Sequence, residues 1–241
     1  MIKPRVCILL NHLDEFDFEM ALLHYLPAER YEVVVTEVWP DDPLAYQLIV
    51  PWSYRKVIKQ ATQAGNVVVM HSSNLPEGRG WAPIYHAFNE QKSEYVISGI
   101  FAADEVDTGD IIVRARFPIE AGYTASFIRT IDEELSAVLV SCILEQWPNG
   151  NIVGTKQIGV GNYRHRRSPI DNEIALSQPL VEILPHLRGM ETENPAFFFH
   201  DGVKYLIEVR PEIKPHMPKR VIIEYPALNK VEFWSDWYDS P

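Results

Sequence analysis

Residues 66–83, NVVVMHSSNLPEGRGWAP, contain the change of pattern that decides the fold. The run 67–70 is wholly apolar, which is typical of a buried β-strand. His71 ends this run, and turn-forming residues then occupy most positions as far as Pro83. The stretch therefore predicts a strand that delivers a titratable side chain to the edge of a sheet, followed by a constrained loop.

The sequence before this stretch repeats the same alternation of strand and helix. Near-continuous apolar runs predict strands at 5–10, 32–38 and 46–50, with helices at 16–26 and, after a loop, within 51–65. This order predicts an α/β fold: a Rossmann-like, mainly parallel sheet with helices on both faces. Ligands of such sheets collect at the carboxyl ends of the strands, which is where His71 lies.

The sequence after the loop predicts two further strands, a long helix and a smaller second unit. Residues 93–119 indicate two strands joined by a structured loop that contains Asp107-Thr108-Gly109. Residues 124–147 have helical spacing, with Thr124 as the N-cap. We expect one domain over 1–160 and a small C-terminal α+β domain over 161–241, with a helix, a hairpin turning at Asp201-Gly202 and more strand after 220.

Composition excludes several classes of function. A net charge of −11 argues against a nucleic-acid-binding protein, which needs a concentrated basic surface. No run approaches the roughly 18 apolar residues of a membrane helix, and the N-terminal apolar run of about six is too short for a secretory signal, so a cytoplasmic location is expected. Cys7 and Cys142 are far apart in the sequence and lack C-x-x-C spacing, so we expect both to be small core residues. The spacing of the histidines does not suggest a metal site.

The motif around His71 resembles the folate-dependent formyltransferases. That family has H-x-S-x-L-P-x-x-R-G-x-x-P followed by D-x-G-x-I, and here the two parts begin at His71 and at Asp107, 36 residues later. The sequence RRSPIDNEI (166–174) resembles the start of the smaller C-terminal domain in the sugar and tRNA enzymes. The resemblance covers roughly residues 1 to 210.

The resemblance implies transfer of a formyl group from 10-formyltetrahydrofolate to an amine. His71 would move the proton or donate to the adduct, and Asp107 would orient the imidazole and take up charge. One position departs from the family, because Val69 stands where an asparagine usually holds the formyl oxygen. We expect Asn74 to supply that donor, with backbone N–H groups or a water as alternatives.

A set of residues near these motifs is expected to bind the folate. The resemblance implies that the loop at 48–58 and the two loops around His71 and Asp107 surround the pterin. The expected cofactor-binding residues are Trp52, Tyr54, Leu75, Pro76, Arg79, Gly80, Val106, Thr108 and Gly109. Core packing of the aromatic side chains at 52–54, and a plain turn at Arg79-Gly80, are the competing interpretations.

Elimination favours a nucleotide-linked amino sugar as the acceptor. The acidic stretch 11–19 replaces the glycine-rich phosphate loop of the purine enzyme, and the C-terminal part is short for a tRNA-binding domain. Guanidinium groups suit diphosphates. The expected substrate-binding residues are Asn11, Arg164, Arg166, Arg167 and Phe198, against the alternatives of a solvated basic face and a hairpin core.

The sugar expected is a 4-amino-4,6-dideoxy hexose bound for lipopolysaccharide O-antigen, capsule or a pseudaminic-acid-type glycan. Two rival functions stay open: a 10-formyltetrahydrofolate hydrolase and a non-catalytic protein that binds folate or a nucleotide sugar. The aromatic tail at 231–241 suits a homodimer contact and equally suits simple packing.

Overall fold

The parallel part of the sheet is built from the apolar runs near the N-terminus. In the computed structural model, which describes residues 3–11, 19–52, 54–56, 58 and 64–237, β1 (Arg5–Leu9) lies between β2 (Glu32–Thr36) and β3 (Leu48–Pro51). Both neighbours run parallel to β1. Every residue of β3 is buried, as expected for a strand covered on both faces. The predicted α/β class, with a parallel sheet and helices, is confirmed.

The sheet continues through β4 (Val68–His71), and its later strands run antiparallel. A parallel bridge between Ile49 and Val67 joins β3 to the start of β4. The remaining strands follow in the order β4, β6 (Glu94–Phe101), β7 (Ile111–Pro118), β11 (Val221–Tyr225) and β12 (Lys230–Trp234). The loop 102–110 is too short for the crossover that a parallel partner needs, so β6 and β7 pair antiparallel.

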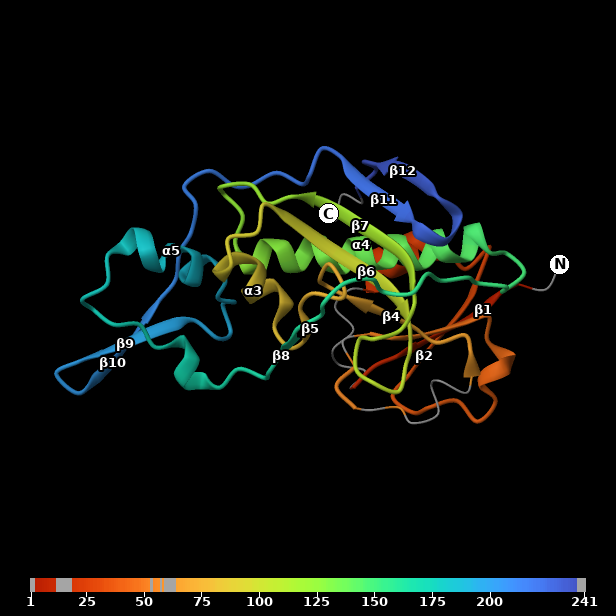
Figure 1. Cartoon of the computed structure of the whole chain (residues 1–241), viewed down its shortest axis with the longest axis horizontal. Helices are drawn as coiled ribbons and strands as arrows, with labels where there is room; N and C mark the ends of the chain where they lie inside the picture. Colours follow the sequence, from red (N-terminus) through yellow and green to blue (C-terminus); the bar gives the residue numbers. More distant parts are fainter. Residues whose placement is uncertain (1–2, 12–18, 53, 57, 59–63, 238–241) are drawn as a thin grey trace.

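The long helix α4 (Ala125–Gln146) lies along this sheet (Figure 1). Its predicted N-cap is confirmed, because the Thr124 side chain accepts a hydrogen bond from the backbone N–H of Phe127. Helices α1 (Glu19–Tyr25) and α3 (Pro83–Asn89) both contact α4. Within the described ranges, no helix has the length and apolar character needed to cross a bilayer.

Two predicted helices fall partly on residues that the structure does not describe. Of the helix predicted at 16–26, α1 accounts for residues 19–25, and residues 16–18 lie outside the described ranges. The helix predicted within 51–65 stays a prediction, because residues 53, 57 and 59–63 also lie outside them.

Beyond residue 160 the chain forms a smaller unit around α5 (Leu180–Arg188) and a hairpin. Strands β9 (Ala196–His200) and β10 (Val203–Ile207) pair antiparallel, and the predicted turn at Asp201-Gly202 is present, with φ of 50° and 77°. A separate apolar cluster supports this unit: Ile174, Ile183, Leu187, Met190 and Ala196. The short elements are β5 (Arg79–Gly80), β8 (Tyr163–Arg164) and the 3-10 turns η2 (Pro43–Ala45), η3 (Pro169–Asn172) and η4 (Pro226–Leu228).

The C-terminal strands differ from the expected division of the chain. The sequence placed all of 161–241 in the second domain, whereas β11 pairs with β7 in the main sheet. Val221, Ile223 and Tyr225 are buried in the same core as α4. The chain therefore leaves the main sheet after β7 and α4 and returns to it at β11. The boundary near residue 160 stays a prediction for the segment that carries α5 and the hairpin.

Candidate active site

The loop after His71 is fixed by hydrogen bonds from the neighbouring strands. The Ser98 hydroxyl on β6 donates to the carbonyl of Ser73 at 2.7 Å. The Arg114 guanidinium on β7 donates to the carbonyl of Leu75. These bonds satisfy the backbone carbonyls of Ser73 and Leu75, two residues that lie outside the β-strands. The many turn residues in 72–83 therefore build a loop of defined shape directly beside the histidine.

The structure brings His71 and Asp107 together. His71 Nδ1 lies 3.4 Å from Asp107 Oδ2, and the two side chains are only 9% and 11% exposed. His71 Nε2 lies 2.9 Å from the carbonyl oxygen of Gly78, and the N–H of Gly80 donates to Asp107 Oδ2 at 2.8 Å. Both ring nitrogens thus face an oxygen acceptor, and only a doubly protonated imidazole can donate to both.

Gln157 fixes the loop that carries Asp107. Its amide nitrogen donates to the carbonyl of Asp107 at 2.8 Å and to that of Gly109 at 2.9 Å. Its amide oxygen accepts from the Arg79 guanidinium at 3.0 Å. Asp107 itself has φ of +56°, a conformation that a non-glycine residue holds only where neighbours stabilise it. The sequence analysis missed Gln157, since an isolated polar residue in a loop gives no pattern.

Replacing Gln157 with alanine is expected to lower the rate of the reaction that uses Asp107 by about tenfold. The change removes three hydrogen bonds that orient the Asp107 loop and the Arg79 side chain. Steady-state kinetics on the variant would measure it, with Gln178→Ala in an exposed turn as the control. Equal rates for Gln157→Ala and the wild type would contradict this positioning role.

Gly109 packs against the backbone of the preceding strand. A Cβ atom at this position would lie 1.7 Å from the carbonyl oxygen of Phe101. Only glycine permits so close an approach. Gly109 was expected to bind the cofactor, and the structure shows its backbone in close approach to Phe101 of β6.

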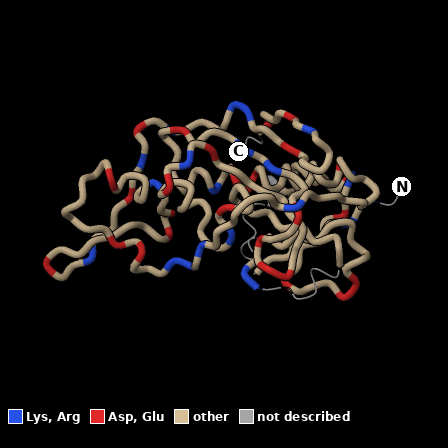
Figure 2. Tube along the Cα trace, in the orientation of Figure 1, with Lys and Arg blue, Asp and Glu red and all other residues tan. Residues whose placement is uncertain are grey.

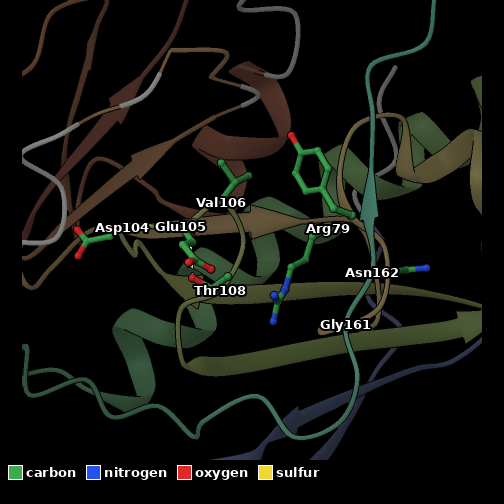
Figure 3. A pocket seen from close by; sticks show the side chains of 8 residues that line it. Arg79, Asp104, Glu105, Val106, Thr108, Gly161 and Asn162 are labelled. Atoms are coloured by element: carbon green, nitrogen blue, oxygen red, sulfur yellow. Dashed lines mark hydrogen bonds between the residues drawn. The ribbon is translucent and has the colours of Figure 1, made fainter.

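A cavity of about 470 Å³ lies beside Asp107. Its lining residues are Arg79, Asp104, Glu105, Val106, Thr108, Gly161, Asn162 and Tyr163. Figure 3 shows the Arg79 side chain between the loop that carries Val106 and Thr108 and the segment 161–162. Three of the residues expected to bind the cofactor, Arg79, Val106 and Thr108, therefore line one cavity. We refer to it as the Arg79 cavity.

A second cavity, of about 370 Å³, lies between the two parts of the chain. Residues from α3, α4, the segment 166–172 and the end of α5 surround it, and its arginines are Arg129, Arg166 and Arg167. The Arg166 guanidinium lies 5.1 Å from the centre of the Trp81 ring, and the Arg167 guanidinium lies 3.4 Å from that of Tyr85. Burial lowers the pKa of Arg167. We refer to this space as the arginine cavity.

One short strand connects the two cavities to the acid–base pair. Arg79 in β5 lines the Arg79 cavity, while Trp81, just after β5, lines the arginine cavity. Gly80 lies between them, and its N–H binds Asp107. A Cβ on Gly80 would lie 2.4 Å from the carbonyl oxygen of Arg164, so β5 fits closely against β8. The N–H of Gly80 thus links Asp107 to the strand whose flanking residues line the two cavities, while His71 and Asp107 themselves are not among the lining residues.

Other residues expected to bind the cofactor lie in apolar packing. Trp52 is 7% exposed and belongs to the main core, as the competing interpretation held, and Tyr54 is half-buried. Leu75 packs with Ile100 and Ile111. Val69 packs against that cluster, so position 69 offers no side-chain donor.

Three other expected site residues have contacts or positions that do not by themselves mark a ligand site. Asn74 is exposed, and no hydrogen bond described for the chain joins it to His71 or Asp107. Asn11 is buried and accepts a hydrogen bond from the backbone N–H of Arg55 at 2.9 Å. Phe198 stacks on Tyr205, with ring centres 5.3 Å apart, and is not among the residues that line either cavity. The roles expected of Asn74, Asn11 and Phe198 stay predictions.

The basic cluster splits into members with different contacts. Figure 2 shows a basic stretch at β8 in a chain whose charges are otherwise interspersed. Arg166 and Arg167 line the arginine cavity, whereas Arg164 pairs with Glu90, the C-cap residue of α3. The sequence grouped the three together because they are adjacent in the chain.

Comparison with known proteins supports the pattern seen at His71 and Asp107. Residues 40–142 match the family model described as Formyl transferase. A methionyl-tRNA formyltransferase of Geobacillus thermodenitrificans is 26% identical over 72% of this chain and 54% of its own length. The chain spans about half the length of the curated relatives it matches.

Solved structures show the same fold. A 4-N formyltransferase from Francisella tularensis matches with a TM-score of 0.70 and 15% identity, covering 88% of this chain and 99% of its own. HypX from Aquifex aeolicus in complex with tetrahydrofolic acid matches with a TM-score of 0.70 and 17% identity, covering 92% of this chain and 42% of its own. At these identities, the likeness establishes the fold.

Proposed function

We propose that the chain transfers a formyl group from 10-formyltetrahydrofolate to the amine of a nucleotide-linked amino sugar. The observation that carries this proposal is the buried His71–Asp107 pair. Asp107 binds the N–H of Gly80 in β5. The residue before Gly80, Arg79, lines one cavity, and the residue after it, Trp81, lines the other. A bimolecular group transfer needs this arrangement, because donor and acceptor must both reach one proton-handling pair.

The Arg79 cavity suits the formyl donor. A pterin ring presents N–H donors and carbonyl acceptors along its edge, and this cavity offers the carboxylates of Asp104 and Glu105 together with the Arg79 guanidinium. The Arg79 guanidinium lines this cavity and donates to Gln157 at 3.0 Å. Bound there, the folate supplies an activated one-carbon group. HypX, which shares the fold, binds tetrahydrofolic acid.

His71 and Asp107 would handle the proton that leaves the acceptor amine. The carbonyl of Gly78 holds Nε2 of the ring, and Asp107 Oδ2 stands by Nδ1. The Asp107 carboxylate stabilises a positive imidazole while the Gly80 N–H keeps that carboxylate in place. Because Val69 is apolar, backbone N–H groups of the loop after His71 or the exposed Asn74 would have to hold the formyl oxygen.

The arginine cavity suits the nucleotide-linked acceptor. Arg166 and Arg167 bring positive charge to a chain with net charge −11. Guanidinium groups form bidentate hydrogen bonds with phosphate. Trp81 and Tyr85 add flat rings beside them. The methionyl-tRNA formyltransferases among the relatives make a tRNA acceptor the main competitor, and the acidic surface disfavours it. A 4-amino-4,6-dideoxy hexose for a surface glycan is our choice of sugar.

One assay separates transfer from the two rival functions. The protein is incubated with 10-formyltetrahydrofolate and a panel of nucleotide-linked amino sugars, and folate release is followed by absorbance. We expect release that depends on the amine. Release without any amine would show a hydrolase, no release would show a binding protein, and release with formylatable tRNA alone would overturn the choice of acceptor.

Replacing Arg166 with glutamine is expected to raise the KM for the nucleotide sugar by about tenfold and to leave the KM for the folate unchanged. Arg166 lines the arginine cavity and not the Arg79 cavity, so only one of the two substrates loses a contact. Arg210→Gln, which removes a charge from an exposed pair with Glu208, is the matched control. A change in the folate KM alone would place the acceptor elsewhere.

A further inference from the structure

A buried carboxylate on α4 lies behind the histidine. Asp132 is 7% exposed, although it stands on the apolar face of the helix between Ile128 and Leu135. A charged group at such a position is costly unless hydrogen bonds and opposite charges compensate it. The proposed transfer reaction, as assigned to His71 and Asp107, does not require it.

The partners of Asp132 come from the two strands that shape the site. The Ser72 hydroxyl donates to Asp132, at 2.8 Å from Oδ1 and 3.0 Å from Oδ2. The Tyr95 hydroxyl on β6 donates to Oδ1 at 3.0 Å. Ser72 is the residue immediately after His71, so this bond fixes the exit of the chain from the histidine. The two hydroxyls thus provide hydrogen-bond partners for the buried oxygens of Asp132.

Two positive groups act on this carboxylate. Burial raises the pKa of the Asp132 carboxyl, and the charges of Arg129 and His71, together with the hydrogen bonds from Ser72 and Tyr95, oppose that rise. Arg129 lies one helical turn before Asp132 and is itself paired with Glu191. Such charge interactions are reciprocal: if a protonated His71 favours the ionised Asp132, then the ionised Asp132 favours a protonated His71 by the same amount.

We propose that Asp132 is a positioning residue for His71, acting through the Ser72 hydroxyl and through its own negative charge. Asp107 holds the imidazole directly at Nδ1, and Asp132 fixes the backbone that carries it. Together the two carboxylates stabilise the doubly protonated ring that faces Asp107 and the Gly78 carbonyl. Arg129 also lines the arginine cavity, so the same network extends to the space assigned to the acceptor.

The direct test follows the protonation of His71 and does not need activity. The C–H and N–H signals of the His71 ring are titrated by NMR in the wild type, Asp132→Asn and Ser72→Ala. The groups that face these two side chains are Asp107, Arg129, Tyr95 and Ser72, and the conservative variants leave Asp107, Arg129 and Tyr95 in place. We expect Asp132→Asn to move the protonation midpoint of His71 to lower pH, because a negative charge that favours the imidazolium is lost.

The second readout rests on the proposed function. Asp132→Asn and Ser72→Ala are each expected to lower kcat for formyl transfer by about tenfold or more, with the KM for the folate unchanged, because neither residue lines the Arg79 cavity. The acidic limb of the rate profile should move to lower pH in Asp132→Asn and stay near its wild-type position in Ser72→Ala, which keeps the charge.

Controls separate this role from general stability. Glu145→Gln removes one negative charge from the same helix at an exposed pair with Arg30, and it should leave both readouts unchanged. A wild-type His71 midpoint in Asp132→Asn, or an equal shift in Glu145→Gln, overturns the proposal. Should the wild type transfer no formyl group at all, the proposed function fails, and the NMR titration still decides the role of Asp132.

Discussion

Replacing His71 with alanine is expected to lower the rate of formyl transfer by about a thousandfold, which is within the range usual for loss of a general acid or base. The imidazole is the one group in contact with Asp107 whose ordinary titration lies near neutral pH. Its removal leaves Asp107 with the N–H of Gly80 but without the imidazole nitrogen at 3.4 Å. Single-turnover kinetics with saturating folate and amino sugar would measure the chemical step.

The fold should survive this substitution. His71 loses one hydrogen bond to the Gly78 carbonyl, worth about 1 kcal/mol, while the bonds of Ser98 and Arg114 to the loop remain. Asp107→Asn keeps the shape of the side chain, and its rate of formyl transfer should also fall by a hundredfold or more. His200→Ala on the exposed hairpin is the control and should leave the rate unchanged. A cooperative unfolding transition with a wild-type rate in His71→Ala would remove the imidazole from the mechanism.

Replacing Gly109 with alanine is expected to destabilise the protein by about 3 kcal/mol or more and to abolish activity. The new methyl carbon would lie 1.7 Å from the Phe101 carbonyl oxygen, and a backbone atom cannot move aside as a flexible side chain can. Relief requires β6 and the Asp107 loop to separate. That movement would also break the Gln157 bonds to the carbonyls of Asp107 and Gly109.

Gly122→Ala is the matched control for this prediction. A methyl group there meets only Pro215 at 3.9 Å, an ordinary contact, so stability and activity should stay close to wild type. Chemical denaturation of the two variants measures the difference. A Gly109→Ala protein as stable as Gly122→Ala would show that the loop and β6 are not packed as described.

The sequence predicted the elements of the site better than their contacts. The apolar run predicted His71 at the end of a strand, whereas the proximity of Asp107 was implied only by the resemblance to the formyltransferases; the structure places the two side chains 3.4 Å apart. The antiparallel direction of β6 and β7 was not visible in their composition, since buried strands of either kind are apolar. Trp52 shows the same ambiguity between a core residue and a ligand contact.

Features that depend on long-range hydrogen bonds could not be predicted from the sequence. Gln157 lies 50 residues from Asp107 along the chain, and its role depends on a pairing of loops that no local pattern records. Asp132 did carry a signal, because an acid between Ile128 and Leu135 interrupts the apolar face of the helix. The return of β11 to the main sheet likewise depends on long-range pairing with β7.

An isotopically labelled formyl group can be followed from the folate to the sugar amine. The protein is given 10-formyltetrahydrofolate labelled with ¹³C at the formyl carbon, with a nucleotide-linked 4-amino-4,6-dideoxy hexose, and the products are followed by NMR. We predict a ¹³C formamide signal on the sugar nitrogen that is absent with His71→Ala and Asp107→Asn. Label that appears only as formate, or that stays on the folate across the acceptor panel, would contradict the account.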